Sequence, residues 1–427
     1  MTLPTVGVSG ADGRAATAIT TTAITTTAGA GTPPSAAGSG AADGAGAGTG
    51  TDIVAAGTDI VAGAGTAGSW ADGPAVGVRV RVPATSANLG PGFDAFGLAL
   101  GFYDDVEVTL RPRGLSVAVD GAENVSRGED NLVVRAIRAT FDELGRPQPG
   151  LEVRCVNRLP HGRGLGSSAA AIVAGVAAGC VLDSAAYLEG TGAGPATGRD
   201  RRPAPPGAPS VAGVAGLDRA VALRMATAIE GHPDNVAAAV FGGLTVAWTG
   251  PGGVAAHRAE PVADLRPVAF VPSVRTSTAD SRGRLPDRLA HADAVFSAGR
   301  AGLLALALTQ SELPAALAGR AAGPAPAEPG PGGSVRAARE ARARLLLAAT
   351  EDRLHQPYRL PAVPESAALV DRLRAAGVAA VLSGSGPTVL ALAVGGEQAA
   401  AAVGVAAPGF AVLPLAVDRA GVQVSRS

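Results

Sequence analysis

The feature that most constrains the fold is a glycine-rich segment, P-H-G-R-G-L-G-S-S-A-A, at residues 160–170. The run L-E-V-R-C-V at 151–156 before it is typical of a β-strand, and the small-residue run at 169–180 is typical of a helix. Glycines let backbone N–H groups approach an anion closely, and a helix N-terminus carries partial positive charge. The succession of strand, loop and helix start therefore indicates a phosphate-binding site and nucleotide chemistry.

This loop differs from a Walker A loop, which requires a lysine after its last glycine. The sequence contains no lysine, so lysine-assisted phosphoryl transfer and Schiff-base chemistry are excluded. Ser167 and Ser168 stand at the expected helix start, where they can cap the helix or turn a hydroxyl toward a phosphate or a metal. An ordinary glycine-rich turn capped by serine remains the alternative for this segment taken alone.

Composition narrows the class of protein. With 427 residues and 47% hydrophobic content, the chain has room for two domains with real cores. A net charge of −1 and 3% aromatic residues argue against nucleic-acid binding. We find no apolar stretch of the roughly 18 residues that span a bilayer and no signal peptide, so we expect a cytoplasmic protein that does not bind membranes. Cys155 and Cys180 are expected to be buried thiols rather than a disulfide.

Shifts in composition divide the chain. Residues 1–75 are rich in Ala, Gly and Thr, which predicts a disordered low-complexity extension. The remainder divides into domains at 76–262 and 263–427, and strands and helices alternate in both, which indicates an α+β or α/β class. Pro/Gly-rich insertions at about 189–213 and about 319–333 are expected to be exposed loops.

Three further segments are dense in residues suited to a site. P-A-T-S-A-N-L-G-P-G-F-D at 83–94 follows a strand-like alternation that begins at Val76. E-G-H-P-D-N at 230–235 follows a predicted helix at 217–229. A second glycine loop, L-S-G-S-G-P-T, lies at 382–388.

The motifs at 83–94, 162–170 and 382–388 resemble, in the same order, the three motifs of the GHMP small-molecule kinases. The resemblance covers roughly residues 78–425, apart from the two insertions. It implies an α+β fold with an N-terminal domain like ribosomal S5 domain 2 and a C-terminal ferredoxin-like domain, with the active site between them. It also implies ATP and Mg²⁺ as cofactors, and a homodimer.

Within this family the chain most resembles the homoserine kinase branch. The residues that carry this resemblance are Asn88 with Asp94, E-G-H-P-D-N at 230–235 and E-D-R-L-H-Q-P-Y-R at 351–359. Resemblance to this branch implies phosphorylation of the L-homoserine hydroxyl by ATP, on the route to threonine. One alternative is another GHMP kinase that acts on a different hydroxylated metabolite. The other is a non-catalytic binding protein with this fold.

The resemblance assigns residues to the nucleotide and its metal ion. Ser168, with Ser167 as second choice, and Glu230 would hold Mg²⁺ through oxygen, which suits a hard cation. The alternatives are a plain helix N-cap for Ser168 and a surface carboxylate for Glu230, although a carboxylate at a helix C-terminus opposes the helix dipole. Asn131 would contact adenine, or else cap a helix. The residues expected around the nucleotide are Pro160, His161, Gly162, Arg163, Gly164, Leu165, Gly166, Ser167, Ser168, Ala169, Ala170 and Asn131.

Homoserine is a zwitterion, so its two charged groups require opposite partners. Its carboxylate suits an arginine fork, and the resemblance assigns Arg282 and Arg359 to it. Its ammonium would bind Asp94, with Asn88 nearby and Asp234 as a further candidate. The alternatives are solvated surface charges for the two arginines and a turn residue for Asn88.

The resemblance places Asn235 at the reacting hydroxyl and His232 in the same pocket, although a structural hydrogen bond is the alternative for the histidine. Related kinases carry a carboxylate where this chain has Asn235, so we expect no strong general base. Positioning and charge neutralisation would then carry the rate, as a loose transition state allows. Asp234 as a base is the competing interpretation.

We predict that Asp234→Asn raises the KM for homoserine more than it lowers kcat, because the carboxylate is expected to bind substrate rather than take its proton. Steady-state kinetics with varied homoserine at saturating ATP measures both constants. A collapse of kcat at unchanged KM would support the base instead.

Overall fold

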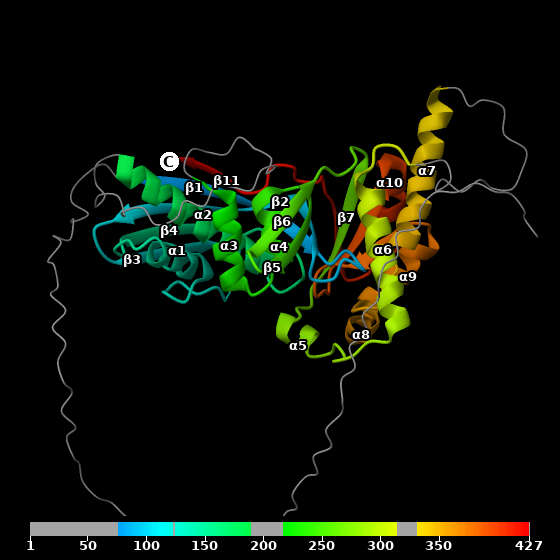
Figure 1. Cartoon of the computed structure of the whole chain (residues 1–427), viewed down its shortest axis with the longest axis horizontal. Helices are drawn as coiled ribbons and strands as arrows, with labels where there is room; N and C mark the ends of the chain where they lie inside the picture. The colour runs from blue at the N-terminus through cyan, green and yellow to red at the C-terminus, as the bar shows by residue number, and fades with distance from the viewer. Residues whose placement is uncertain (1–75, 123, 189–216, 314–330, 427) are drawn as a thin grey trace, which may run out of the picture. The chain divides into compact units, whose positions relative to one another are not determined.

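The computed structural model of the chain describes residues 76–122, 124–188, 217–313 and 331–426 (Figure 1). The predictions for 1–75 and for the insertion at 189–213 lie outside these residues. Of the insertion predicted at 319–333, only the last three residues are described, and they open helix α7 (Pro331–Ala349).

Within these ranges the first sheet has seven strands, in the order β11–β1–β2–β4–β3, with β5 pairing to β2 and β6 to β5. Its pairings are antiparallel except for β3 and β4, which run parallel. The strand β11 returns from the end of the chain to pair with β1 (Figure 1). The strands are β1 (Gly77–Ala87), β2 (Phe96–Arg111), β3 (Leu115–Asp120), β4 (Gly150–Val156), β5 (Leu244–Gly250), β6 (Gly253–Ala259) and β11 (Gln423–Arg426).

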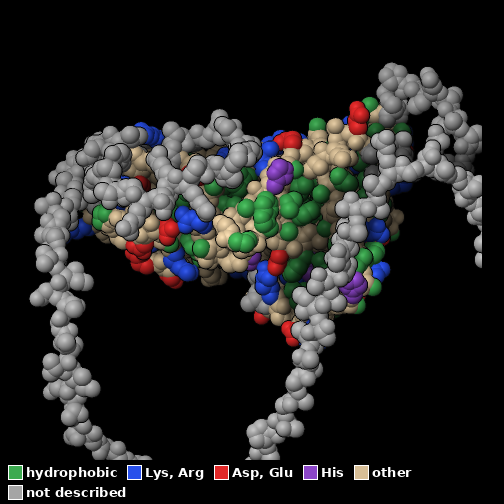
Figure 2. Space-filling model, viewed as in Figure 1, with side chains coloured by type: hydrophobic (Ala, Val, Ile, Leu, Met, Phe, Trp, Pro, Cys, Tyr) green, Lys and Arg blue, Asp and Glu red, His purple; other side chains and the backbone are tan. Residues whose placement is uncertain are grey.

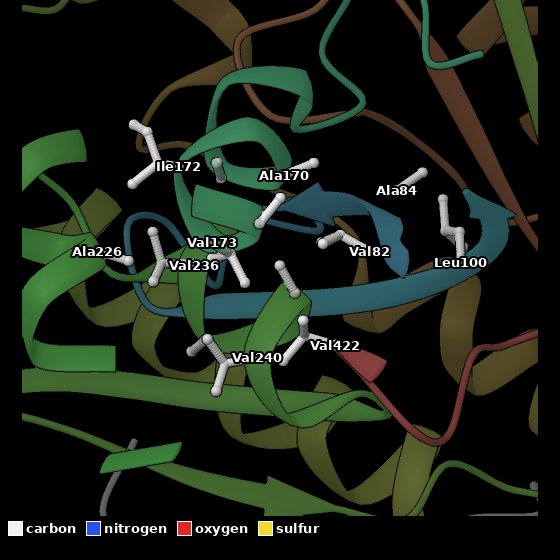
Figure 3. Packing of buried hydrophobic residues seen from close by; sticks show 14 of the residues in the cluster. Val82, Ala84, Leu100, Ala170, Ile172, Val173, Ala226, Val236, Val240 and Val422 are labelled. Carbon is white, nitrogen blue, oxygen red and sulfur yellow. The ribbon is translucent and has the colours of Figure 1, made fainter. Parts of the chain in front are cut away.

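A layer of helices packs on this sheet. Helices α2 and α4 lie directly against β1, and α1 and α3 pack against α2 (Figure 1). Side chains such as Val82 and Val173 are buried between strand and helix (Figure 3). The predicted strand before the glycine loop, the helix after the loop and the helix predicted at 217–229 are confirmed. The helices are α1 (Leu132–Glu143), α2 (Ser167–Leu188), α3 (Arg219–Glu230) and α4 (Asp234–Phe241).

The small-residue run of α2 is explained by its close approach to α1. A Cβ atom at Gly175 would lie 2.4 Å from the carbonyl oxygen of Val133 and 2.6 Å from the Cβ of Ala136. The same helix carries Cys180, and β4 carries Cys155; both thiols are free and buried, as expected. Burial raises the pKa of each thiol to about 11, so neither is poised to react as a thiolate.

The expectation that no apolar stretch is long enough to cross a membrane is wrong. By length and composition, Ser167–Ser184 of α2 and the whole of α6 (His291–Thr309) pass that test. The α2 window is 72% buried inside the protein. This burial is expected of a core helix, and core helices meet the same length and composition criteria as membrane spans. The α6 window is only 22% buried, because much of that helix lies on the surface.

The second sheet has four strands in the described residues, in the order β10–β7–β9–β8, all antiparallel. Helices α7, α9 and α10 pack on it, and α6 packs against α7. The α+β class is therefore confirmed. The remaining elements are β7 (Leu265–Pro272), α5 (Thr278–Arg282), α8 (Gln356–Arg359), a 3₁₀ turn (Leu360–Ala362), α9 (Pro364–Ala375), β8 (Ala380–Leu382), β9 (Val389–Val394), α10 (Gly395–Val403) and β10 (Phe410–Pro414).

We predict that Gly175→Ala lowers the free energy of unfolding by roughly 1–3 kcal/mol, because the added methyl group overpacks the contact between α1 and α2. Gly396→Ala in α10 is the matched control, since a Cβ there meets nothing within 4 Å. That control is expected to be neutral or stabilising by up to about 1 kcal/mol through helix propensity. Urea unfolding of both variants measures the difference, and equal stability of the two would contradict the packing argument.

Candidate active site

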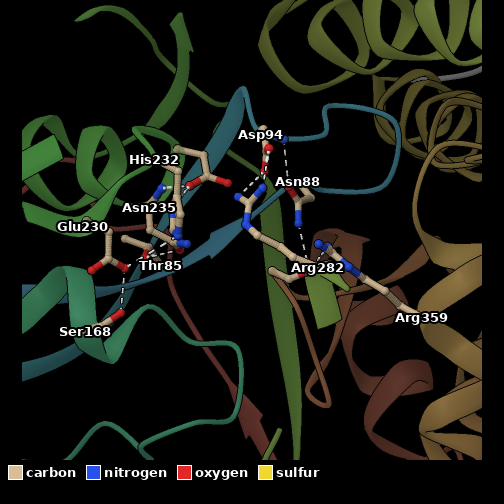
Figure 4. Close-up of polar contacts among 11 residues, drawn as sticks. Thr85, Asn88, Asp94, Ser168, Glu230, His232, Asn235, Arg282 and Arg359 are labelled. Atoms are coloured by element: carbon tan, nitrogen blue, oxygen red, sulfur yellow. Dashed lines mark hydrogen bonds and ion pairs between the residues drawn. The ribbon is translucent and has the colours of Figure 1, made fainter. Parts of the chain in front are cut away.

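A cavity of about 260 Å³ opens where the glycine-rich segments of the two sheets meet. It brings together residues that are widely separated in the sequence, and Figure 4 shows most of its polar side chains converging. The lining residues are Asn88, Asp94, Gly162, Gly164, Gly166, Ser167, Ser168, Glu230, His232, Asp234, Asn235, Thr276, Arg282, Arg359, Gly384 and Ser385.

The loop at 160–166 has a backbone that only glycine adopts readily. Gly162, Gly164 and Gly166 have φ values of 66°, 81° and 68°, in the left-handed region. A Cβ at Gly166 would also lie 1.9 Å from the Oγ1 of Thr85. The loop runs straight into Ser167, the first residue of α2, where the first N–H groups have no intrahelical acceptor. The predicted succession of a glycine loop and a helix start is therefore present.

The second glycine loop, at 382–388, holds the first one in place. The hydroxyl of Ser383 donates to the carbonyl oxygen of Gly164 at 2.6 Å. The N–H of Thr388 donates to the carbonyl oxygen of Arg163 at 3.2 Å. Because carbonyl oxygens of the first loop are bonded to the second, the position of the first loop depends on both halves of the chain.

Ser168 and Glu230 form an oxygen pair at one end of the cavity (Figure 4). The Ser168 hydroxyl donates to the Glu230 carboxylate at 2.6 Å. The carboxylate side chain is 9% exposed, so it is not the solvated surface group that was the alternative. Burial raises the pKa of Glu230. In the described part of the chain no cluster of three His, Cys, Asp or Glu residues could hold a metal alone, so a cation here would take further oxygens from phosphates or water.

The turn between α3 and α4 places His232, Asp234 and Asn235 together. The Nδ1 of His232 and the backbone N–H of Asn235 both lie within hydrogen-bond distance of one Asp234 oxygen, at 3.0 and 2.7 Å. The bond to Asp234 raises the pKa of His232. The Asn235 Oδ1 accepts from the hydroxyl of Thr85 at 2.8 Å. With its oxygen occupied, the Asn235 side chain has its NH₂ group left to donate toward the cavity.

Asp94 and Arg282 pair with each other rather than standing apart. The two guanidinium nitrogens donate to the two carboxylate oxygens at 3.0 and 2.9 Å. The Asn88 Oδ1 accepts from the N–H of Asp94 at 2.9 Å, and both residues have positive φ. Asn88 is thus a turn residue, which was the alternative to a substrate-binding role. It also lines the cavity, as expected. The separate roles given to Asp94 and Arg282 remain predictions.

Arg359 is a buried cation at the cavity wall. Arg359 is 3% exposed, which rules out the alternative that it is a solvated surface charge. One terminal nitrogen, Nη1, donates to the carbonyl oxygen of Gly384 at 3.2 Å. The Nε atom is buried and has no hydrogen-bond partner among the described residues. Burial lowers the pKa of Arg359, and a buried, incompletely paired guanidinium favours an anion beside it.

Several predicted nucleotide contacts do not line this cavity. Asn131 caps α1: its Oδ1 accepts from the N–H groups of Val133 and Val134, and its Nδ2 donates to the carbonyl oxygen of Ser126. Its alternative role is therefore the one observed, and contact with adenine remains a prediction. The other predicted contacts outside the lining are Pro160, His161, Arg163, Leu165, Ala169 and Ala170.

Thr276, Gly384, Ser385 and the buried Thr85 were not among the predicted site residues. The 382–388 motif was a visible signal for the glycine and the serine, which line the cavity. Thr276 carried no signal of its own; its N–H bonds the carbonyl oxygen of the first loop at Gly162, at 2.9 Å.

Comparison with known proteins gives consistent matches. The protein-family model for the GHMP kinases N terminal domain matches residues 131–183, and the family model for the GHMP kinases C terminal region matches residues 335–408. A homoserine kinase of Streptomyces coelicolor is 46% identical over 355 residues, 80% of this chain and 96% of that protein. One of Streptomyces avermitilis is 45% identical over 354 residues, 82% of this chain and 96% of that protein.

A solved structure of homoserine kinase from Cytophaga hutchinsonii is also similar, with a TM-score of 0.60. It is 24% identical and covers 82% of this chain and 97% of that one. The expected two-domain fold, with a ribosomal S5-like N-terminal domain and a ferredoxin-like C-terminal domain, is confirmed.

We predict that the His232 imidazole titrates above its ordinary pKa of 6.5, because its bond to the Asp234 carboxylate favours the protonated ring. At pH 7 a larger share of this side chain is then protonated than of a free histidine. Nitrogen-15 NMR of the imidazole measures the midpoint. Asp234→Asn is expected to lower it, and a wild-type midpoint at or below 6.5 would contradict the prediction.

Proposed function

The chain belongs to the homoserine kinases of the GHMP kinase family, and we propose that its cavity is the site where ATP phosphorylates the L-homoserine hydroxyl. The products are ADP and O-phospho-L-homoserine, on the route to threonine. One observation carries the assignment of the site: a single cavity joins the glycine loop and the N-terminus of α2 to Asp94, Arg282 and Arg359. The first set suits a triphosphate, and the second suits a zwitterionic amino acid.

The triphosphate would bind along residues 160–170 through backbone N–H groups and the α2 N-terminus. With no lysine in the sequence, that backbone and bound Mg²⁺ would carry most of the charge neutralisation. Ser168 and Glu230 would hold the ion, which would supply positive charge to neutralise the phosphates. The 2.6 Å contact between these side chains supports this role, because both already offer oxygen at one point of the cavity wall.

Homoserine would bind where Asp94 and Arg282 now pair. Its ammonium would take the Asp94 carboxylate, and its carboxylate would take the Arg282 and Arg359 guanidinium groups. Exchange of one ion pair for two keeps every charge paired, which limits the desolvation cost of binding. The unpaired Nε of Arg359 supports the carboxylate position, since an anion there satisfies a buried donor.

The chemical step would depend on positioning rather than on a strong base. The side-chain oxygen of Asn235 accepts from Thr85, so its NH₂ group would donate to the homoserine hydroxyl oxygen and orient it toward the γ-phosphate. Asp234 is 3% exposed and already accepts from the N–H of Asn235. That geometry supports a role for Asp234 in holding His232 and the turn, while a loose transition state needs little help in removing the proton.

We also propose that the protein is a cytoplasmic homodimer. Helix α6 supports the dimer, since Val295 is 58% exposed and Leu306 is 41% exposed on that mostly exposed helix. On the face shown in Figure 2, basic and acidic side chains are interspersed, so that face has no large patch of a single charge sign. Sedimentation of wild type and Leu306→Glu tests the dimer, and two identical profiles would exclude this part of α6 as the interface.

Release of ADP from ATP tests the function. We predict release that requires both Mg²⁺ and L-homoserine, with phosphate appearing on the homoserine oxygen. Mevalonate or a sugar alcohol is expected to support much slower release; faster release would favour another GHMP kinase. Binding of ATP without any release would favour a non-catalytic protein.

We predict that Glu230→Gln lowers kcat/KM for homoserine by on the order of 100-fold and raises the Mg²⁺ concentration needed for half-maximal rate, because a metal ligand is lost. Glu340→Gln is the matched control, since the Glu340 side chain is 52% exposed on α7. A Glu230→Gln enzyme with the wild-type Mg²⁺ dependence would remove Glu230 from the metal site.

A further inference from the structure

His355 lies in the segment E-D-R-L-H-Q-P-Y-R at 351–359, and none of the roles above explains it. The residue is completely buried, immediately before α8. It does not line the cavity, but it contacts two parts of the chain that do.

The hydrogen bonds of His355 determine its tautomer. Its Nδ1 lies 3.2 Å from the Nη1 of Arg359, and a guanidinium can only donate. Its Nε2 lies 2.9 Å from the carbonyl oxygen of Gly90, which can only accept. The ring therefore accepts at Nδ1 and donates at Nε2, which is a neutral imidazole. Burial lowers the pKa of His355 to about 4, in keeping with that form.

The nearby Asp352 does not alter this tautomer. Its closest oxygen lies 3.5 Å from the imidazole Nε2, longer than the contact to Gly90. The carboxylate instead accepts the backbone N–H groups of Leu354, His355 and Gln356. Asp352 thus fixes the backbone that carries the imidazole.

Phe93 joins the same cluster from the loop at 88–94. Its ring stacks on the imidazole of His355 with centroids 5.1 Å apart and planes inclined by 25°. The guanidinium carbon of Arg359 lies 5.2 Å from the Phe93 centroid. The loop and Arg359 therefore meet at the ring of Phe93, which also stacks on the imidazole.

The loop at 88–94 needs support of this kind. Asn88, Leu89 and Asp94 have φ values of 69°, 50° and 56°, which are unfavourable for residues other than glycine. Such a backbone persists where surrounding contacts hold it. The bond from His355 to Gly90 is one such contact, and it acts on the segment that presents Asp94 to the cavity.

We propose that His355 is a positioning residue, whose two ring nitrogens separately hold Arg359 and the 88–94 loop in the geometry that binds the two charges of the substrate. The proposal rests on the proposed function. Through Nδ1 the imidazole directs the guanidinium expected at the substrate carboxylate. Through Nε2 it fixes the loop expected to present Asp94 to the ammonium.

Two variants separate these two bonds. His355→Gln can place a donor near the position of Nε2 but offers no acceptor at the position of Nδ1. His355→Asn can place an oxygen near the position of Nδ1 but does not reach Gly90. The probes are L-homoserine, 4-hydroxybutyrate, which lacks the ammonium, and 3-aminopropan-1-ol, which lacks the carboxylate.

We predict that His355→Gln weakens binding of homoserine and 4-hydroxybutyrate by about 10- to 100-fold, the usual size of one charge-assisted hydrogen bond, and leaves 3-aminopropan-1-ol within about twofold. His355→Asn is expected to weaken homoserine and 3-aminopropan-1-ol instead. KM for homoserine and inhibition constants for the two analogues measure these effects. The KM for ATP is expected to stay within about twofold in both variants.

Equal losses for all three probes, or no loss in either variant, would overturn the proposal. His257→Gln is the matched control, because His257 lies exposed on β6 away from these contacts. Nitrogen-15 NMR of the wild-type enzyme gives a second test, independent of whether the variants fold: a His355 ring that is protonated at Nδ1 at pH 7 would also overturn it. Wild-type enzyme that does not phosphorylate homoserine would instead refute the proposed function.

Discussion

The contact between two glycine loops is the constraint on which the site depends. Carbonyl oxygens of the 160–166 loop accept hydrogen bonds from Ser383 and Thr388, which precede and follow the second loop's glycines. A Cβ at Gly164 would lie 2.3 Å from the carbonyl oxygen of Ser383, so no other residue fits there unless the backbone moves. The cavity exists because both sheets deliver a glycine-rich turn to the same place.

Charge is arranged around this contact so that few groups stand unpaired. Asp94 pairs with Arg282, and Ser168 donates to Glu230. Arg359 is one of the exceptions, with a buried Nε that has no partner within the described ranges. A substrate with one positive and one negative group fits this pattern, since it exchanges an existing ion pair and satisfies the remaining donor.

Sequence reasoning predicted elements more securely than contacts. The glycine loop at 160–166 and the helix that follows it could be predicted from local glycine content and small-residue composition, which act over a few residues. The expectation that no stretch is apolar enough to cross a membrane was wrong for α2, because a helix buried in a protein core can match a membrane span in length and composition. Asn131 was ambiguous for a similar reason, since an asparagine before a helix caps it whether or not a ligand is near. Thr85 was missed because its partner, Asn235, is 150 residues away.

The sequence by itself determined which functional groups are available. It supplies glycines that can adopt a left-handed backbone before a helix, and serine and glutamate oxygens but no lysine. It also supplies arginine and carboxylate side chains of the kinds that can pair with the two charges of an amino acid. Those choices depend on residue type and short spacing. Tertiary structure alone decided which groups meet, because pairing across sheets depends on packing and strand order. It paired Asp94 with Arg282, 188 residues apart, and brought His355 against Gly90, 265 residues apart. The buried imidazole of His355 thereby contacts both Arg359 and the loop that carries Asp94.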